Sequence, residues 1–346
     1  MRLRPLAATA ALVLSLGVLA ACGSGSGSDD EPASSGADET SSDSAFPVTV
    51  EHRLGETVIE AEPERVVSVG LTEQDILLEL GVTPVAVTEW YGEQPFATWP
   101  WAQDLLGDAE PVVLSQSDGI EFEKVAALEP DLIIGTNSGM TKKDYELLSA
   151  IAPTVTNVKG STPYFSPWQD QVLQVSRALG READGQALVD EVEGKYEAVR
   201  DAHPEWEGKT ATFSQGGPYD GILYVYPDGL STSFLTDLGF TMTEGLEGFA
   251  PDIGSQAEIS AENTALIEAD VVVFATEDAD MFDFLQDFGT IDTLPAVTEN
   301  RSVYTDGTLA GALYFLTPLS LDYALERLTP MLEQAVAGEA PREFPA

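Results

Sequence analysis

FEKVAALEPDLIIGT, residues 122–136, and AENTALIEADVVVFA, residues 261–275, follow one pattern. Each stretch opens with a helix-like segment, passes through an acidic residue and ends in an apolar run rich in branched side chains. Glu123 of the first stretch corresponds to Glu262 of the second, 139 residues later. The same offset also pairs Glu129 with Glu268, Asp131 with Asp270, and residues 132–134 with 271–273. A helix followed by a buried strand, present twice, predicts a duplicated α/β lobe.

Strand-like and helix-like segments alternate on both sides of the first stretch. The expected strands are 64–70, 84–89, 131–136 and 154–158, and the expected helices are 72–81, 122–129 and 144–152. Short β-branched runs between amphipathic helices are typical of βαβ units. The first half of the chain therefore predicts a parallel sheet.

The strand pattern stops between residues 166 and 203. Two helical segments lie there, separated near Gly180, and the second, Glu182–Ala202, is long for a globular protein. The alternation then resumes with expected elements at 209–215, 231–240, 261–268, 270–276 and 302–306, and with a last helix from about residue 317 to Ala337. We therefore predict an α/β fold of two lobes with mainly parallel sheets, joined by a single long helix.

The N-terminus resembles a bacterial lipoprotein signal. Arg2 and Arg4 precede an apolar run of signal-peptide length, and the run ends in LAAC at Cys22. Cys22 is the single cysteine of the chain, so we expect it to carry a lipid and to anchor the protein to the outer face of the cell membrane. An ordinary signal peptide cleaved elsewhere, or a simple membrane anchor, is the alternative.

The next segment, residues 23–45, is rich in Gly, Ser and acidic residues and has no apolar periodicity, so we expect a disordered tether. No later stretch is apolar for long enough to span a bilayer. The expected organisation is a signal peptide with a lipobox at 1–22, the tether at 23–45, an N-terminal lobe at 46–180, an interlobe helix at 181–204 and a C-terminal lobe at 205–346.

The charge of the chain excludes some partners. Its 59 acidic and 16 basic residues give a formal net charge of −43. Such a field disfavours nucleic acid and anionic lipid surfaces, and it favours neutral or cationic ligands. Adaptation to salt, or solubility alone, explains the same composition equally well.

Catalytic and metal-binding motifs are lacking in the sequence. The two histidines, His52 and His203, lie away from the expected strand ends, and a lone cysteine cannot form a zinc cluster with them. We find no phosphate-binding loop, nucleophile elbow or metalloprotease motif. We therefore expect that the chain is not an enzyme, and that it has no cofactor or protein metal ligand of its own.

A ligand site is expected where the parallel strands end, because ligands of open α/β sheets bind outside the carboxyl ends of the strands. The loops expected there, which include 215–229, 247–252 and 306–315, are rich in aromatic residues. Trp99 and Trp101 are expected to pack the loop between strands. The candidate ligand-binding residues are Trp90, Thr136, Asn137, Tyr164, Tyr224, Phe249 and Tyr314. Trp90 and Tyr224 are the strongest of these, and an aromatic cleft between lobes suits a bulky, partly apolar ligand.

Three segments in order carry a family resemblance. PERVVSVGLTEQDILLELGVTPVAVTEW (63–90), FEKVAALEPDLIIGT and PLSLDYALERLTPML (318–332) resemble the class III periplasmic binding proteins of ABC importers. The resemblance covers about Glu64 to Leu332, and the style of DGIEFEKVAALEPD is similar to the ferric-siderophore (FecB/FhuD-like) branch. It implies two lobes joined by one helix, with limited hinge motion.

The resemblance also implies a function. It identifies the chain as a substrate-binding lipoprotein, expected to be a monomer, that captures a ferric siderophore and delivers it to ABC permease subunits. Glu123 and Glu262 match glutamates that pair with permease arginines in the family. The alternative is that each merely complements its helix dipole.

The ligand class follows from the charges near the expected site. Arginine is absent from the expected edge loops, and only Lys142, Lys143 and Lys159 lie near them. Anionic catecholate complexes would need an arginine cluster. We therefore expect a neutral or cationic ferric siderophore of the hydroxamate type, with Asn137 as a polar contact. Haem or cobalamin capture, and an extracellular adhesion or enzyme module, remain alternatives.

Overall fold

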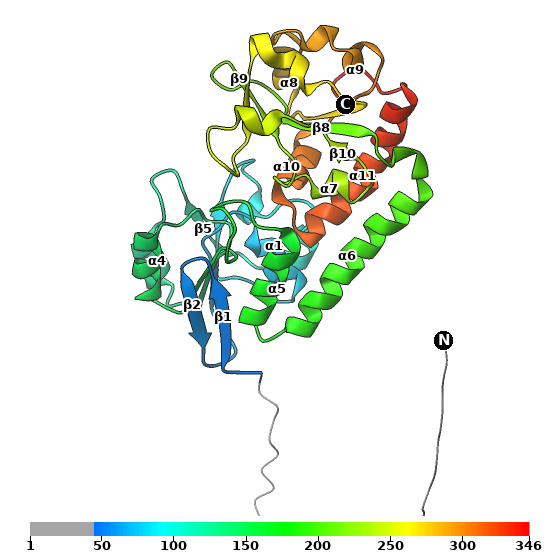
Figure 1. Ribbon diagram of the computed structural model, residues 1–346. Coiled ribbons are helices and arrows are strands. Elements are labelled where there is room, and N and C mark those ends of the chain that lie inside the picture. Colours follow the sequence, from blue (N-terminus) through cyan, green and yellow to red (C-terminus); the bar gives the residue numbers. More distant parts are fainter. Residues whose placement is uncertain (1–44, 346) are drawn as a thin grey trace, which may run out of the picture. The chain divides into compact units, whose positions relative to one another are not determined.

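The computed structural model of the chain describes residues 45–345. Cys22, the expected signal peptide and nearly all of the expected tether lie outside the described residues. The described part contains a five-stranded sheet, a six-stranded sheet and a small hairpin (Figure 1). The hairpin pairs β1 (Val48–His52) with β2 (Gly55–Ile59) in antiparallel register.

The first sheet has the order β5-β4-β3-β6-β7, and all its neighbouring strands are parallel. Its strands are β3 (Val66–Ser68), β4 (Ala86–Glu89), β5 (Val112–Ser115), β6 (Leu132–Gly135) and β7 (Thr154–Thr156). Its helices are α1 (Glu73–Glu79), η1 (Pro95–Ala97), α2 (Gln103–Leu106), α3 (Phe122–Ala127), α4 (Lys142–Ser149) and α5 (Trp168–Ala178). The expected strands and helices of this half are thus confirmed, and the edge strand β5 and the short helices η1 and α2 are additions to them.

The second sheet has the order β11-β9-β8-β12-β13, with β10 beside β8. Its strands are β8 (Thr210–Gln215), β9 (Ile222–Tyr226), β10 (Thr241–Met242), β11 (Ala257–Ser260), β12 (Val271–Ala275) and β13 (Ser302–Tyr304). Strand β9 runs antiparallel to β8 and β11, and the other pairs are parallel. The helices of this half are η2 (Pro204–Trp206), α7 (Ser233–Thr236), η3 (Leu246–Phe249), η4 (Ala261–Ile267), α8 (Ala279–Gln286), η5 (Ile291–Thr293), α9 (Pro295–Thr298), α10 (Gly307–Phe315) and α11 (Pro318–Ala337).

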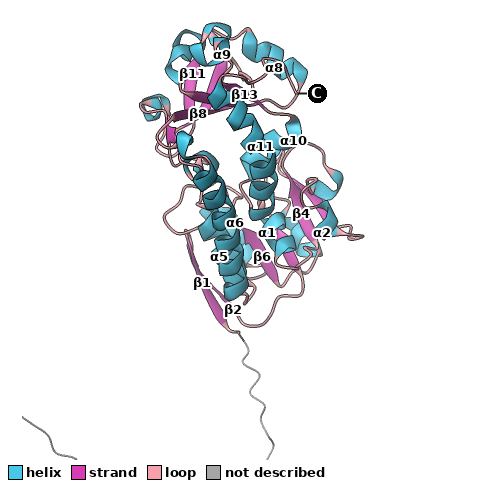
Figure 2. Ribbon diagram, turned by 90° about the vertical axis from the view of Figure 1, so that its right-hand side faces the viewer, coloured by secondary structure: helices cyan, strands magenta, loops and turns pink. Residues whose placement is uncertain are grey.

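A long helix, α6 (Glu182–Ala202), connects α5 of the first half to β8 of the second, at the bounds expected from the sequence. Helices α1, α5, α6 and α11 pack against one another (Figure 2). Tyr196 of α6 donates its phenol proton to the carbonyl of Leu321 in α11, over 3.2 Å. Although α6 and α11 are long, no helix within residues 45–345 has the length and apolarity needed to cross a membrane.

The acidic pair of the duplicated pattern has a shared structural role. The Asp131 carboxylate accepts hydrogen bonds from the backbone N–H groups of Glu64 (2.8 Å) and Arg65 (2.9 Å), which lead into β3. The Asp270 carboxylate accepts from the backbone N–H of Thr210 (2.8 Å), where β8 begins. In each half the acid that precedes β6 or β12 therefore fixes the start of the neighbouring parallel strand, β3 or β8.

The helix of the second stretch differs from the expectation. Residues 261–267 form the 3₁₀-helix η4 rather than an α-helix. The Thr264 hydroxyl donates to the carbonyl of Ala261 (3.2 Å), and the Asn263 amide donates to the Ser260 hydroxyl (3.2 Å). Short polar side chains that bond to nearby groups compete with the α-helical pattern, which explains the tighter helix.

Two segments expected as loops are regular structure. Within 215–229, residues 222–226 form β9, whose Leu223 and Val225 are buried while Tyr224 lies on the other face. Within 306–315, residues 307–315 form α10, and the Asp306 carboxylate caps it by accepting from Leu309 N (2.7 Å). The period-two alternation of ILYVY, and the aspartate before an apolar run, were the signals of these elements.

One apolar cluster extends through both halves of the described chain. It includes Ile134 of β6, Val175 of α5, Val192 of α6, Phe213 of β8 and Leu321 of α11. Buried apolar side chains pack at crystal-like density, so they resist sliding past one another. The shared cluster is consistent with the limited hinge motion that the family resemblance implies. The residue boundaries between the lobes stay a prediction.

Candidate ligand-binding site

A cavity of about 880 Å³, called here the main cavity, lies where strands of both sheets end. Trp90 and Tyr91 directly follow β4 of the first sheet, while Gly216 follows β8 and Glu277 follows the end of β12. The complete lining is Trp90, Tyr91, Gln215, Gly216, Gly217, Pro218, Tyr219, Tyr224, Tyr226, Gln256, Glu277, Asp278, Asp280, Met281, Phe284 and Tyr314. Its place at the carboxyl ends of the strands agrees with the position expected from the sequence.

A second cavity of about 420 Å³ adjoins the main cavity. The residues that line both are Trp90, Gln215, Tyr226, Gln256 and Tyr314. Asn137 and Tyr164 of the first half line only the second cavity. Together the two cavities offer the volume and the apolar walls typical of small-molecule sites.

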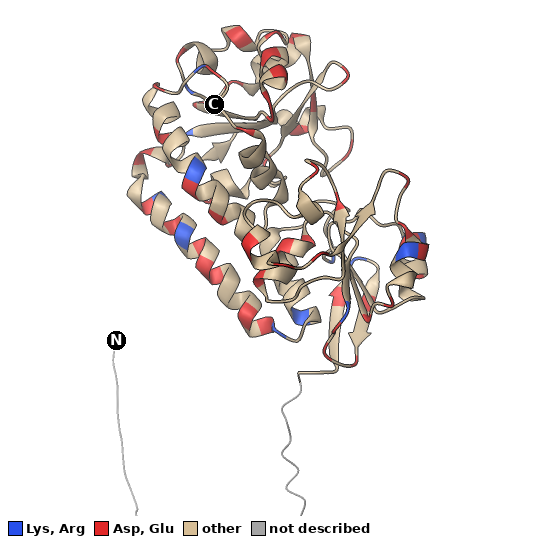
Figure 3. Ribbon diagram, turned by 180° about the vertical axis from the view of Figure 1, so that it is seen from behind, with Lys and Arg blue, Asp and Glu red and all other residues tan. Residues whose placement is uncertain are grey.

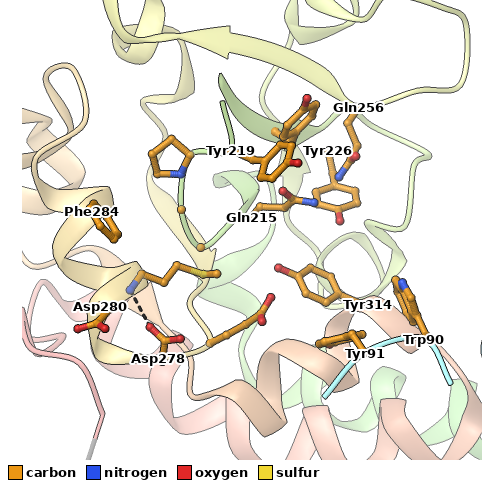
Figure 4. Close-up of a pocket in the computed structure, with 16 residues that line it drawn as sticks. Trp90, Tyr91, Gln215, Tyr219, Tyr226, Gln256, Asp278, Asp280, Phe284 and Tyr314 are labelled. Atoms are coloured by element: carbon orange, nitrogen blue, oxygen red, sulfur yellow. Dashed lines mark hydrogen bonds between the residues drawn. The ribbon is translucent and has the colours of Figure 1, made fainter. Parts of the chain in front are cut away.

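Aromatic rings from both halves form the wall between the cavities. The ring of Trp90 lies 5.5 Å from Phe315 and 6.3 Å from Tyr314, both of α10. Figure 4 shows Trp90, Tyr91 and Tyr314 together at one side of the main cavity. Two loop rings support this wall from behind, because Trp99, only 4% exposed, lies 5.1 Å from Tyr91 and stacks on Trp101.

Glycine makes the close packing of this wall possible. A Cβ atom at Gly311 of α10 would lie 2.6 Å from the ring of Trp99, so a side chain there would push the ring aside. Gly139 has a φ of +62°, and a Cβ atom there would lie 2.1 Å from the Tyr164 hydroxyl. Gly311 needs glycine for space because Trp99 is buried, whereas Gly139 needs it for its left-handed conformation.

The phenols of the wall stay neutral. Burial raises the pKa of Tyr91, Tyr226 and Tyr314 above the usual range for tyrosine, and the charge of Glu277 contributes to each rise. Tyr226 keeps its raised pKa although Gln215 and Gln256 bond to its oxygen. These side chains therefore act as neutral hydrogen-bond donors and as apolar ring surfaces.

The charges around the site are negative. Figure 3 shows acidic residues spread over the described chain and few lysines or arginines. The described residues that line the two cavities include no Lys or Arg, whereas Glu277, Asp278 and Asp280 line the main cavity. Burial, and then the neighbouring charge of Asp278, raises the pKa of Glu277. The site is therefore poorly suited to an anionic ligand.

The candidate residues from the sequence divide into three groups. Trp90, Tyr224 and Tyr314 line the main cavity, and Trp90 is 39% exposed. Asn137 and Tyr164 line the second cavity. Thr136 and Phe249 line neither of the two cavities.

The structure gives Thr136 a supporting position rather than a place on a cavity wall. It is 1% exposed, and its hydroxyl donates to Glu73 Oε1 (3.1 Å). Glu73 Oε1 also accepts from the backbone N–H of Asn137 (2.6 Å), which places Asn137 at the second cavity. The buried Glu73 carboxylate was missed by the sequence reasoning, because an acid inside an amphipathic helix resembles a surface residue.

Other lining residues were also missed. Glu277 immediately follows the predicted strand 270–276, so its place in the chain was the available signal, but acidic residues were treated as surface by default. Gln256 and Phe284 reach the cavity from segments that carry no motif. Of the described residues, no group of three or more His, Cys, Asp or Glu side chains could hold a metal ion.

Comparison with known proteins shows the family of this chain. The family model described as periplasmic binding protein matches residues 66–309. The chain belongs to the periplasmic binding protein family. A solved periplasmic solute-binding protein of Mycobacterium smegmatis is 39% identical, with a TM-score of 0.77 over 84% of this chain and 98% of that chain.

Two relatives from Bacillus subtilis (strain 168) extend the comparison. The probable siderophore-binding lipoprotein YfiY is 28% identical over 274 residues, which cover 76% of each chain. The iron(3+)-hydroxamate-binding protein YxeB is 26% identical over 335 residues, or 93% of this chain and 94% of that protein. This periplasmic binding protein thus resembles siderophore-binding and iron-binding proteins over most of its length.

Family membership confirms three predictions. The two-lobed α/β fold is that of class III binding proteins. Members of the family are solute-binding proteins rather than enzymes. The relation to YfiY, a probable siderophore-binding lipoprotein, confirms the expected family and branch.

Proposed function

We propose that this periplasmic binding protein captures a ferric siderophore of the hydroxamate type in the two adjoining cavities and delivers it to an ABC permease. The observation that carries the proposal is the main cavity of about 880 Å³, which is rich in aromatic rings and free of Lys and Arg among its lining residues. The names of YfiY and YxeB support a siderophore and an iron–hydroxamate complex, respectively.

The chemistry of the walls supports the hydroxamate class. Ferric catecholates carry strong negative charge, which the lining acids would repel. A neutral or cationic complex can instead pack on the rings of Trp90, Tyr224 and Tyr314 and bond to Asn137 and Tyr164. The siderophore would keep the iron wrapped in its own oxygen ligands, so no protein ligand to iron is proposed.

Tryptophan fluorescence offers a direct test of ligand class. Titration with ferric hydroxamates, ferric catecholates, haem and cobalamin is expected to give saturable quenching with a ferric hydroxamate, because Trp90 lines both cavities. Trp90→Phe is expected to reduce the quenching, since Trp90 is the one tryptophan among the described residues that lines either cavity. Quenching by catecholates alone would refute the ligand class, and a haem absorbance band would identify the haem alternative.

We further propose that Glu123 and Glu262 dock the protein on its permease. Both are exposed, lie in the first turn of α3 and of η4, and precede the parallel strands β6 and β12. Helices run antiparallel to the strands in such units, so both helix starts lie at the carboxyl-end edge that carries the cavities. Helix capping alone would not require the two glutamates to occupy matching positions in both halves.

The double variant Glu123→Ala and Glu262→Ala tests docking. Uptake of the ferric ligand is expected to fall about tenfold or more, as for loss of interfacial charge pairs, while ligand affinity is unchanged. Asp104→Ala with Asp283→Ala removes one exposed acid from a helix of each half and serves as the matched control. Unchanged uptake in the first double variant would show that the two glutamates only stabilise their helices.

The location proposed for the protein rests on the N-terminal sequence and on the lipoprotein relatives. We propose that Cys22 carries the lipid that holds the protein at the outer face of the cell membrane, and that residues 23–45 act as the tether of a monomer. The relation to YfiY supports the lipoprotein assignment.

A further inference from the structure

Glu277 stands apart from the other two acids of the main cavity. Asp278 caps α8, because its carboxylate accepts a hydrogen bond from the backbone N–H of Met281 (2.7 Å). Asp280 lies in the first turn of the same helix, where a negative charge complements the helix dipole. Both acids therefore have a structural reason for their positions, and both are exposed.

Glu277 has no comparable reason within the described chain. It follows the end of β12, is half-buried, and makes no hydrogen bond or ion pair with any residue of 45–345. Its burial in the cavity wall raises its pKa. A half-buried carboxylate without a partner costs free energy, so the fold alone gains nothing from an acid at this position.

The surroundings of Glu277 suit a positive charge. The rings of Trp90 and Tyr91 lie 4.9 Å apart, and Tyr314 lies 6.0 Å from Tyr91, so three electron-rich rings line the same cavity. The Tyr91 hydroxyl is buried and makes no hydrogen bond to any described group. A carboxylate beside clustered aromatic rings is the arrangement that proteins use to bind ammonium groups.

We propose that the main cavity selects a ferric siderophore that carries an alkylammonium group, and that Glu277 is the specificity-determining residue that accepts this group. The inference rests on the proposed function and deepens it, because it names the charge and the functional group of the ligand. Glu277 would form a charge-assisted hydrogen bond with the ammonium, and the rings would cover its alkyl chain.

A matched pair of ligands tests this assignment. Two ferric trihydroxamates with identical iron-binding arms are compared, one with a free terminal amine and one with that amine acetylated. The wild-type protein is expected to bind the ammonium form about tenfold more tightly or better, as for a hydrogen bond between charged groups. Glu277→Gln is expected to bring the ratio of the two affinities to about one.

A nearby acid provides the control. Asp283 lies on α8, is exposed and lies outside the lining of the main cavity, so Asp283→Asn removes the same charge without touching the site. This variant is expected to keep the wild-type ratio. Measurable binding of the acetylated ligand by Glu277→Gln shows that the variant is folded.

Each contrary result has a distinct meaning. Equal affinities of the wild-type protein for both ligands would overturn the selection of a cation and leave the proposed function standing. If Glu277→Gln still prefers the ammonium form, the preference comes from the overall negative charge of the protein, which is −43, and the role of Glu277 is overturned. Failure to bind either trihydroxamate, with binding of another ligand of the panel, would overturn the proposed function itself.

Discussion

Asp75→Asn is expected to remove a pH-dependent loss of stability of about 4 kcal/mol, which the raised pKa of Asp75 imposes between about pH 4 and pH 7. Asp75 lies in α1 and is fully buried. Burial raises the pKa of its carboxyl from 3.8 to about 7, although hydrogen bonds from Thr317 and Trp101 oppose the rise. The charge of Glu79 adds to the increase.

The direction follows from the protons bound in each state. In the unfolded chain Asp75 loses its proton near its ordinary pKa, whereas the folded protein holds it until about pH 7. The unfolded state therefore binds fewer protons between these values, and the free energy of unfolding falls as the pH rises. The stabilisation is complete below the ordinary pKa and is lost as the pH passes through about 7.

Urea unfolding at several pH values between about 4 and 8 measures the effect. Asp75 Oδ2 accepts from Trp101 Nε1 and from Thr317 Oγ1, each over 2.7 Å, and an asparagine oxygen can keep both bonds. The asparagine amide group would take the place of Oδ1, which is buried without a partner. We therefore expect Asp75→Asn to have a free energy of unfolding about 1–3 kcal/mol below that of the wild type at low pH. The slope against pH is therefore the informative quantity. Parallel curves for the two proteins would contradict the assignment, and the exposed Asp104→Asn provides the control.

Glu73→Ala is expected to lower the free energy of unfolding by about 3–5 kcal/mol. The Glu73 carboxylate is fully buried and accepts hydrogen bonds from Asn137 N, Thr136 Oγ1 and Thr72 N. Alanine would leave these donors without their acceptor. It would also open a void beside Gly70, because the Glu73 carboxylate fills the space there. A Cβ atom added to Gly70 would lie only 2.0 Å from this carboxylate. Denaturant unfolding measures the loss.

The same substitution is expected to affect the site. Glu73 holds the backbone of Asn137, which lines the second cavity, so ligand affinity should fall together with stability. Glu123→Ala removes an exposed glutamate of a neighbouring helix and should leave stability within about 0.5 kcal/mol of wild type. A loss of similar size in both variants would show that the hydrogen bonds of Glu73 contribute no more to stability than an exposed surface charge.

Much of the fold could be predicted because its signals are local. The apolar runs of β3, β6 and β12 and the spacing of α6 are periodic over one element, so they can be read without knowing what packs on them. The two segments that were wrongly expected to be loops, 222–226 and 307–315, gave no equally clear periodic signal. The run of α10 is apolar on all sides, because the helix is buried, and thus lacks the period that separates helix from loop.

The site was only partly predictable for a related reason. The rule for parallel sheets gave the edge, and Trp90, Tyr224 and Tyr314 lie on the main cavity there. Phe249 was predicted for the same reason, as an aromatic residue in a loop at this edge, yet it lines neither cavity. An aromatic side chain in a loop indicates available ring surface, but the direction in which it packs depends on residues far away in the sequence.

The sequence by itself determined the duplicated helix-and-strand pattern, the long connecting helix and the edge where a ligand site had to lie, because periodicity and chain order are properties of neighbouring residues. Only the tertiary structure decided which of the 59 acidic residues have a buried carboxylate and whether that carboxylate has hydrogen-bond donors. Glu73 and Asp75 are buried with their own donors, whereas Glu277 is half-buried without one. Desolvation and hydrogen-bond partners come from segments that are distant in the chain, so no local pattern could separate these three residues from the acids on the surface.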